Sequence, residues 1–256
     1  TGTKATYTVT VGTRSVRATD NHPFLVLEDA RRDGRVRARY RQVWKTVAEL
    51  TVGDLVAVPR GLPEFGRSLH FHDGDEFGPA TSNADLAWLL GYFLGDGNTQ
   101  SAGRTHRVQF ACVAADRDVR DEIIRIVAEQ FGLRAIEADD LRVVVNSKRL
   151  VEWLWTNGFA GTALTKSVPD WIHDLPADER LAFLGGWVDA DGYVGPARSG
   201  SVLLTSGNES LLGSAKALAQ LAGLNAAGPY HFASPHPHDA TRLVDGYRLH
   251  ITGAFE

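Results

Sequence analysis

The chain has 256 residues, 43% of them hydrophobic, so it can bury a sizeable core as one large domain or two smaller ones. It has one cysteine, Cys112, which excludes an internal disulfide framework and leads us to expect a cytoplasmic protein. It has no apolar run of the roughly 20 residues that span a bilayer, so we expect no membrane partner. The net charge of −4 argues against a uniformly basic DNA-binding protein but leaves room for a local basic face.

The first 60 residues are predicted to form short β-strands. β-Branched and aromatic residues gather at 7–11, 15–19, 24–27, 43–45 and 55–58, and turn residues separate these runs. Asp33-Gly34 predicts a further hairpin, because this dipeptide favours tight turns. Residues 61–82 are rich in Gly, Pro, His and Asp without an apolar period, so we predict a linker there.

From residue 83 to residue 256 the sequence repeats itself. Each copy has an apolar helix ending in Asp-Gly, a strand, an amphipathic helix and a second strand. The second copy also carries an insertion at 228–246 that is rich in His and Pro, for which we expect a solvated loop. The repeat predicts two similar α/β halves, residues 83–165 and 166–256, related by a pseudo-two-fold axis.

The two apolar helices carry small residues four positions apart. Small residues at this spacing let two helices approach backbone to backbone, so we expect the helices to pack in parallel about the pseudo-dyad. Glycine is also expected just past each helix end, at Gly97 and Gly192. The residues of the predicted helix interface are Gly91, Gly95, Gly186 and Ala190.

This packing would bring Asp96 and Asp191 together at two helix C-termini. The arrangement is electrostatically unfavourable, because a helix C-terminus already carries partial negative charge. A divalent cation resolves the conflict, since two carboxylates and the helix-end carbonyls of Gly95 and Ala190 form an all-oxygen site suited to Mg²⁺ or Mn²⁺. Such an ion can activate water and stabilise the leaving oxygen in phosphodiester hydrolysis.

Residues 89–97 (LLGYFLGDG) and 184–192 (LGGWVDADG) resemble the LAGLIDADG motif of homing endonucleases, and the resemblance covers residues 85–252. It implies an α+β fold with saddle-shaped antiparallel sheets and a monomer that cuts double-stranded DNA, with Asp96 and Asp191 as metal-binding catalytic residues. Lys166, in the run Lys-Ser-Val-Pro, resembles the block that precedes the second motif in intein endonucleases, which implies a third catalytic residue. Arg248 is the nearest cationic candidate for the matching place in the second copy.

Residues that read DNA bases should be polar and face away from the helices. Arginine suits the edge of guanine, and glutamine or asparagine suits the edge of adenine. The strand periodicity predicts this role for Arg107, Gln109, Arg142, Asn146 and Arg248.

Residues 19–24 (TDNHPF) resemble the intein motif in which a threonine and a histidine three positions later activate the first splice junction. The resemblance implies a partial Hint-type splicing domain over residues 1–60, with Thr19 and His22 as its motif residues and host-protein exteins as partners. Residues 1–2 (TG) and 255–256 (FE) do not resemble the residues at splice junctions, and the chain contains no methionine. We therefore expect an excerpt of a longer precursor that does not splice as given.

Two alternatives to an active endonuclease stay open, together with one further possible site. The chain could be a LAGLIDADG-fold DNA-binding factor that no longer cleaves, although a pure binder has no need of paired acids at helix ends. It could also be a degenerate insertion kept as a scaffold for splicing. A zinc site formed by His231, His236 and His238 is less favoured, because the intervening prolines impose no metal geometry.

Overall fold

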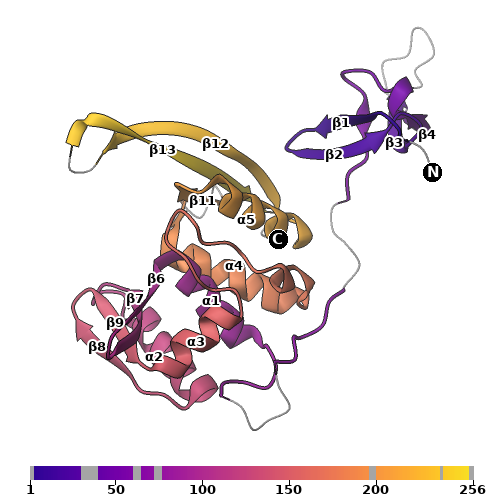
Figure 1. Ribbon diagram of the computed structural model, residues 1–256. Helices are drawn as coiled ribbons and strands as arrows, with labels where there is room; N and C mark the ends of the chain where they lie inside the picture. The colour runs from indigo at the N-terminus through magenta and orange to yellow at the C-terminus, as the bar shows by residue number, and fades with distance from the viewer. Residues whose placement is uncertain are drawn as a thin grey trace. The chain divides into compact units, whose positions relative to one another are not determined.

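The chain forms two compact units, Thr1–Arg60 and Gly61–Glu256. The computed structural model in Figure 1 describes residues 3–29, 40–59, 65–71, 77–195, 200–236 and 239–253. The hairpin predicted at Asp33-Gly34 lies outside these residues. No helix among them is long and apolar enough to cross a bilayer.

The first unit consists of two small antiparallel sheets with little buried interior. Its strands are β1 (Thr6–Val11), β2 (Arg14–Thr19), β3 (Pro23–Asp29), β4 (Tyr40–Thr46) and β5 (Leu55–Val56). β1 pairs with β2, and β3 lies between β4 and β5. Among the described hydrophobic side chains of this unit only Ala18 and Val26 are buried, whereas Trp44 is 69% exposed and Leu55 is 55% exposed. The unit therefore leaves much of its apolar surface uncovered.

The second unit contains two halves with the same order of elements. The first half has α1 (Ala84–Asp96), β6 (Gly97–Ala102), β7 (Thr105–Ala111), α2 (Arg117–Phe131), β8 (Ala135–Asp139), β9 (Arg142–Asn146) and α3 (Lys148–Thr156). The second half has α4 (Ala177–Asp191), β10 (Gly192–Val194), β11 (Ser201–Ser206), α5 (Glu209–Leu221), β12 (Asn225–His236) and β13 (Asp239–Thr252). The strand orders β6-β7-β9-β8 and β10-β11-β13-β12 correspond position by position.

Four strands and one helix were not foreseen from the sequence. The strands β6, β8, β10 and β12 are the outer members of the two sheets. The strand β6 has polar and small residues, β8 and β10 are short, and β12 lies in the His- and Pro-rich insertion, so none of them carries a clear apolar strand signal. Helix α3 was missed because its apolar positions span only nine residues.

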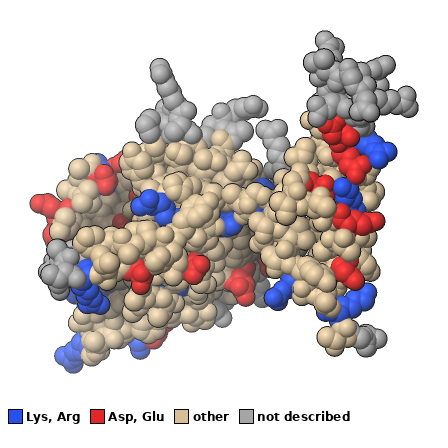
Figure 2. Space-filling model, turned by 90° about the horizontal axis from the view of Figure 1, so that it is seen from above, with Lys and Arg blue, Asp and Glu red and all other residues tan. Residues whose placement is uncertain are grey.

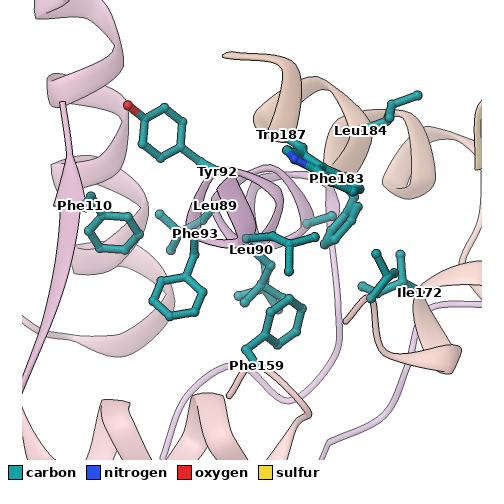
Figure 3. Packing of buried hydrophobic residues seen from close by; sticks show 14 of the residues in the cluster. Leu89, Leu90, Tyr92, Phe93, Phe110, Phe159, Ile172, Phe183, Leu184 and Trp187 are labelled. Carbon is teal, nitrogen blue, oxygen red and sulfur yellow. The ribbon is translucent and has the colours of Figure 1, made fainter. Parts of the chain in front are cut away.

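The core of the second unit is built around α1 and α4. Its apolar side chains come from both helices, from the inner strands and from α2 and α5. Figure 3 shows Tyr92 and Phe93 of α1 on the side of Phe110 from β7, whereas Phe183 and Trp187 of α4 point towards α1. Each motif helix thus packs both on its partner helix and on its own sheet, so its C-terminal end is held on two sides.

The insertion of the second copy is not the solvated loop that we expected. Residues 229–236 and 239–247 extend β12 and β13 into a long two-stranded ribbon, drawn in yellow in Figure 1. Backbone pairing of the two strands orders this His- and Pro-rich segment, which composition alone did not indicate. His231 pairs with Asp245 on the ribbon (Nε2–Oδ1 2.8 Å), while His238 and the side chain of His236 lie outside the described part of the chain.

The described part of the predicted linker is not a free connection but belongs to the second unit. Arg67 donates its backbone N–H to the Asp174 carbonyl, and residues 69–71 pair with residues 80–82. Glu179 in the first turn of α4 is only 4% exposed and accepts hydrogen bonds from the hydroxyls of Ser68 and Ser82. Glu179 therefore ties the segment that precedes α1 to the start of α4.

Replacing Glu179 by alanine is expected to lower the free energy of unfolding by about 2 kcal/mol, because two hydroxyls lose their buried charged acceptor. Chemical denaturation of the full chain measures this loss. Asp178→Ala removes a carboxylate from the same helical turn, but Asp178 is exposed, so we expect an effect below about 1 kcal/mol. Equal losses in both variants would contradict a stabilising role for the Ser68–Glu179–Ser82 contacts.

Candidate functional site

The helices α1 and α4 touch through their backbones at two related points. A Cβ atom on Gly91 would lie 2.8 Å from the carbonyl carbon of Phe183, and closer still to its oxygen. A Cβ atom on Gly186 would lie 2.8 Å from the carbonyl carbon of Trp88 in the same way. Only glycine fits at these two positions, and the exchange of equivalent contacts reflects the pseudo-two-fold axis.

The C-terminal ends of the two helices lie side by side. A Cβ atom on Gly95 would lie 2.7 Å from the Cβ of Ala190 and 3.2 Å from Oδ2 of Asp191. The carboxylate of Asp191 therefore reaches across to the end of α1. At the edge of the helix pair, Trp88 Nε1 donates a hydrogen bond of 2.8 Å to Asp189 Oδ2, a contact that the sequence did not indicate.

Gly97 and Gly192 are required for close approach and not for a left-handed backbone. Both glycines follow a helix end directly, as the sequence predicts, but their φ angles are −92° and −87° and so lie outside the left-handed region. A Cβ on Gly97 would lie 2.5 Å from the carbonyl oxygen of Phe93, and one on Gly192 would lie 2.5 Å from that of Val188. Glycine thus lets each helix pass directly into a strand, β6 or β10, immediately after its aspartate.

The surroundings at the helix ends disfavour the ionised form of Asp96 and Asp191. Burial, followed by the negative charge of Asp191, raises the pKa of Asp96 to about 6, while Lys166 acts in the opposite direction. Desolvation also raises the pKa of Asp191, and Lys166 again opposes this effect. The described residues contain no group of three or more His, Cys, Asp or Glu that could hold a metal ion. A cation at this place would therefore rely on the two carboxylates together with backbone carbonyls.

Lys166 lies at the end of α1 and is only 9% exposed. Its Nζ donates to the carbonyls of Leu94 (2.9 Å) and Gly97 (2.7 Å), and to those of Phe93 and Gly95 at 3.3 Å. Burial lowers the pKa of Lys166, whereas the negative charges of Asp191 and Asp96 raise it. The structure thus brings Lys166 together with both acids, and it also reveals contacts to α1 that the sequence did not suggest.

The polar residues predicted to read DNA lie on the sheet faces turned away from the core. Arg107 and Asn146 are direct neighbours across β7 and β9, and Gln109 and Arg142 occupy the same face. Gln109 is only 8% exposed, which limits its reach, and Arg142 pairs with Asp139. Residues on the polar outer strand β6 were missed, among them Gln100, whose Oε1 accepts a 2.7 Å hydrogen bond from Arg107 Nε.

Arg248 occupies the corresponding face of the second sheet. It is the cross-strand neighbour of Thr205 on β11, and its guanidinium lies 4.8 Å from the centre of the Phe232 ring. Lys166 is the only described cation that influences the pKa of Asp96 and Asp191, so Arg248 does not take the place of a second lysine beside them.

Thr19 and His22 share one turn between β2 and β3 of the first unit. The backbone N–H of His22 donates to the carbonyl of Thr19 (3.0 Å), and the Thr19 hydroxyl donates to Oδ1 of Asn21 (2.9 Å). The His22 ring is exposed and makes an edge contact with Phe24, with ring centroids 5.3 Å apart. The turn thus holds the two residues close together with the imidazole accessible.

Surface charge is mixed on the face of the molecule shown in Figure 2, where blue and red side chains are interspersed. Several arginines are neutralised locally, because Arg117 pairs with Asp121 and Glu137, and Arg125 pairs with Asp85, Glu122 and Glu129. These pairs lie on or next to α2, which packs on the core side of the first sheet. Acids thus compensate cations on and beside α2, and Asp139 compensates Arg142 on the polar sheet face.

Comparison with known proteins finds similar segments inside much longer chains. One is the iron-sulfur cluster assembly SufBD family protein ML0593 of Mycobacterium leprae, 37% identical over 204 residues, 75% of this chain and 23% of that protein. Another is the replicative DNA helicase DnaB of Rhodothermus marinus, 28% identical over 180 residues, 68% of this chain and 15% of the helicase. Protein RecA of Mycobacterium tuberculosis is 28% identical over 167 residues, 62% of this chain and 19% of RecA. The chain spans less than a quarter of each of these relatives.

Two solved structures of the homing endonuclease I-DmoI also align with the chain. Mesophilic variants of that enzyme give a TM-score of 0.45 at 18% identity, covering 66% of this chain and 88% of theirs. The complex of I-DmoI with DNA and Mn gives 0.46 at 16% identity, covering 66% and 89%. In the second half of the second unit, from α4 into the ribbon, residues 178–238 match the family model of the LAGLIDADG-like domain.

Proposed function

We propose that this chain is a single-chain, metal-dependent endonuclease of the LAGLIDADG type that cuts double-stranded DNA at a specific site. The observation that carries the proposal is the meeting of Asp96 and Asp191 at the ends of two helices in backbone contact, with the buried Lys166 beside them. The match of residues 178–238 to the LAGLIDADG-like domain supports it, because this segment includes Asp191 and the second motif helix.

The residues at the helix ends suit a divalent cation. Asp96, Asp191 and the carbonyls of Gly95 and Ala190 offer hard oxygen ligands, and the raised pKa of Asp96 reflects an excess of negative charge that a cation would relieve. A bound Mg²⁺ or Mn²⁺ would supply Lewis-acid activation of water and of the scissile phosphate. The chain itself holds the carboxylates at the dyad, while the polar sheet faces position the DNA on either side.

We further infer that the chain belongs to an insertion within a host protein, with residues 1–60 as part of a splicing domain. An iron-sulfur assembly protein, a helicase and RecA share no function by name, yet each contains a segment similar to this chain. The open apolar surface of the first unit supports the view that further β-structure covers it, and Thr19 and His22 share an accessible turn. The host exteins would then be the partners of this unit.

Plasmid cleavage tests the enzymatic proposal. One plasmid carries the host gene with the coding segment of the insertion removed, and its control carries the uninterrupted insertion, in which the two halves of the target are separated. Double-strand cutting of the first plasmid alone in the presence of Mg²⁺ is the expected result. Specific binding without cutting would favour the non-cleaving DNA-binding alternative. Absence of binding would contradict the endonuclease proposal and leave the scaffold reading.

Arg107→Ala is expected to weaken target binding about tenfold, because Arg107 is the polar-face cation of β7 and its loss removes a contact worth about 1–3 kcal/mol. Fluorescence anisotropy with Ca²⁺ in place of Mg²⁺ measures binding without cleavage. Arg117→Ala is the matched control, since it removes an arginine from α2 behind the same sheet. If the two variants bind DNA equally well, the polar face of this sheet is not the DNA surface.

A further inference from the structure

The two helix ends at the paired acids are not equivalent. Lys166 Nζ donates to four carbonyls in or just after the last turn of α1. In the part of the chain that the structure describes, no lysine or arginine donates to the carbonyls of the corresponding turn of α4, residues 187–192. Among the described residues, the end of α1 therefore has a fixed cation that the end of α4 lacks.

The loop that carries Lys166 is held on both sides. The backbone N–H of Lys166 closes a turn onto the carbonyl of Thr162 (2.8 Å). The carbonyl of Lys166 accepts a 2.9 Å hydrogen bond from Nδ2 of Asn208, whose Oδ1 caps the start of α5. Lys166 thus connects α5 of the second half to the end of α1 in the first, and its ammonium has little freedom to leave the α1 carbonyls.

The position of the ammonium matters for cation binding. Asp191 reaches across to Gly95, so these two residues would form one pair of cation ligands, and Lys166 Nζ lies 3.3 Å from the Gly95 carbonyl oxygen. The pseudo-two-fold axis relates this pair to Asp96 and Ala190. An ammonium beside the first pair competes for its carbonyl oxygen and repels a cation there. No described lysine or arginine donates to the Ala190 carbonyl of the second pair, which Lys166 reaches only through its charge on Asp96.

We propose that Lys166 is a positioning residue that acts as a built-in cation at the Asp191–Gly95 side, so that the two sides bind divalent metal unequally and the tighter site is Asp96 with Ala190. This inference rests on the proposed metal-dependent function. It extends that function by giving the two acids different roles: Asp96 is a ligand of the tight metal, and Asp191 is in part a counter-ion of Lys166.

Mn²⁺ binding to the full chain tests the proposal, with free Mn²⁺ followed by electron paramagnetic resonance. Wild type is expected to show one tight and one weaker site. Lys166→Met removes the charge at nearly constant volume and should tighten the weaker site about tenfold, corresponding to about 1.4 kcal/mol. Lys216→Met is the matched control, because Lys216 Nζ also donates to a carbonyl, that of Gly228 (2.8 Å), but away from the acids. We expect its two affinities to equal those of wild type.

A second comparison does not depend on the folding of the Lys166 variant. Asp96→Asn should abolish the tight site, because Asp96 is its carboxylate ligand. Asp191→Asn should change the affinity of the tight site no more than about threefold, which is well under the 1.4 kcal/mol of a tenfold change. Equal losses in the two variants, or loss of the tight site in Asp191→Asn alone, would overturn the inference. Two equal sites in wild type that Lys166→Met leaves unchanged would overturn it while leaving the endonuclease proposal intact. A wild-type chain that binds no Mn²⁺ would overturn both.

Discussion

Asp96→Asn and Asp191→Asn are each expected to reduce DNA cleavage at least about 1,000-fold while making the metal-free protein more stable. Activity falls because an amide is a poor ligand for a hard divalent cation. Stability rises because the carboxylates repel each other and the helix ends when no cation is present. Plasmid cleavage with Mg²⁺ and thermal unfolding in EDTA measure the two effects.

The stability gain should depend on pH in a defined direction. The pKa of Asp96 is raised to about 6, so the folded state retains a proton that the unfolded state releases at lower pH. The stability linked to this proton is fully present below the ordinary carboxyl pKa of 3.8 and is lost as pH rises through about 6. The Asp96→Asn variant would avoid this loss, so it should gain about 1 kcal/mol at pH 7.5, after allowance for solvent screening, and nothing near pH 3.5.

Asp189→Asn is the matched control for these variants. It makes the same chemical change two residues before Asp191, and the amide oxygen can still accept the hydrogen bond from Trp88. We expect this variant to retain cleavage within about threefold, which is less than the 1.4 kcal/mol of a tenfold change. A loss as large as that of Asp191→Asn would mean that general negative charge at the helix end, and not the specific pair of acids, supports activity.

Gly91→Ala is expected to lower the free energy of unfolding by about 3 kcal/mol or to prevent folding, because the added methyl group meets the backbone of α4. The atoms that it would meet are the carbonyl of Phe183 and the backbone nitrogen of Trp187, neither of which can rotate away. The helices would have to separate, and this would move Asp96 away from Asp191. Chemical denaturation measures the loss of stability, and Mn²⁺ binding reports the loss of the paired acids.

Gly185→Ala provides a control within α4 itself. A Cβ atom on Gly185 has no neighbour within 4 Å, so alanine there gains helix propensity without a steric cost. We expect this variant to be stabilised by about 0.5–1 kcal/mol. The two glycine-to-alanine changes should therefore have opposite signs. Effects of the same sign and size would contradict the described contact between α1 and α4.

The helix pairing could be predicted from the sequence because the apolar helix with small residues occurs twice. A single apolar helix with Gly91 and Gly95 is an ordinary core helix, but its repetition at Gly186 and Ala190 implies a partner, and the structure places all four residues at the helix contact. Strand β7 could be predicted because Val108 and Phe110 alternate with polar residues, and β9 because three consecutive valines favour a strand.

Other features depend on contacts that a single sequence does not record. The carbonyls that surround Lys166 are backbone atoms, so no residue type marks them. The outer strands β6 and β8 take their conformation from pairing with β7 and β9, because β6 consists of polar and small residues and β8 is only five residues long. The ribbon of β12 and β13 likewise depends on cross-strand hydrogen bonds, which override a composition typical of loops.

Asp96 and Asp191 are each the last residue of a helix, and a strand begins at the next residue. Asp96 ends α1 and Gly97 begins β6, just as Asp191 ends α4 and Gly192 begins β10. Within each half, the helix that carries the aspartate continues directly into the sheet that carries the polar face. The two halves contact each other along α1 and α4. Polar side chains on one sheet could therefore diverge after a gene duplication without disturbing the acids or the other sheet. Substitutions on one sheet at a time could therefore change the DNA sequence that the corresponding half recognises, and the whole target would become asymmetric.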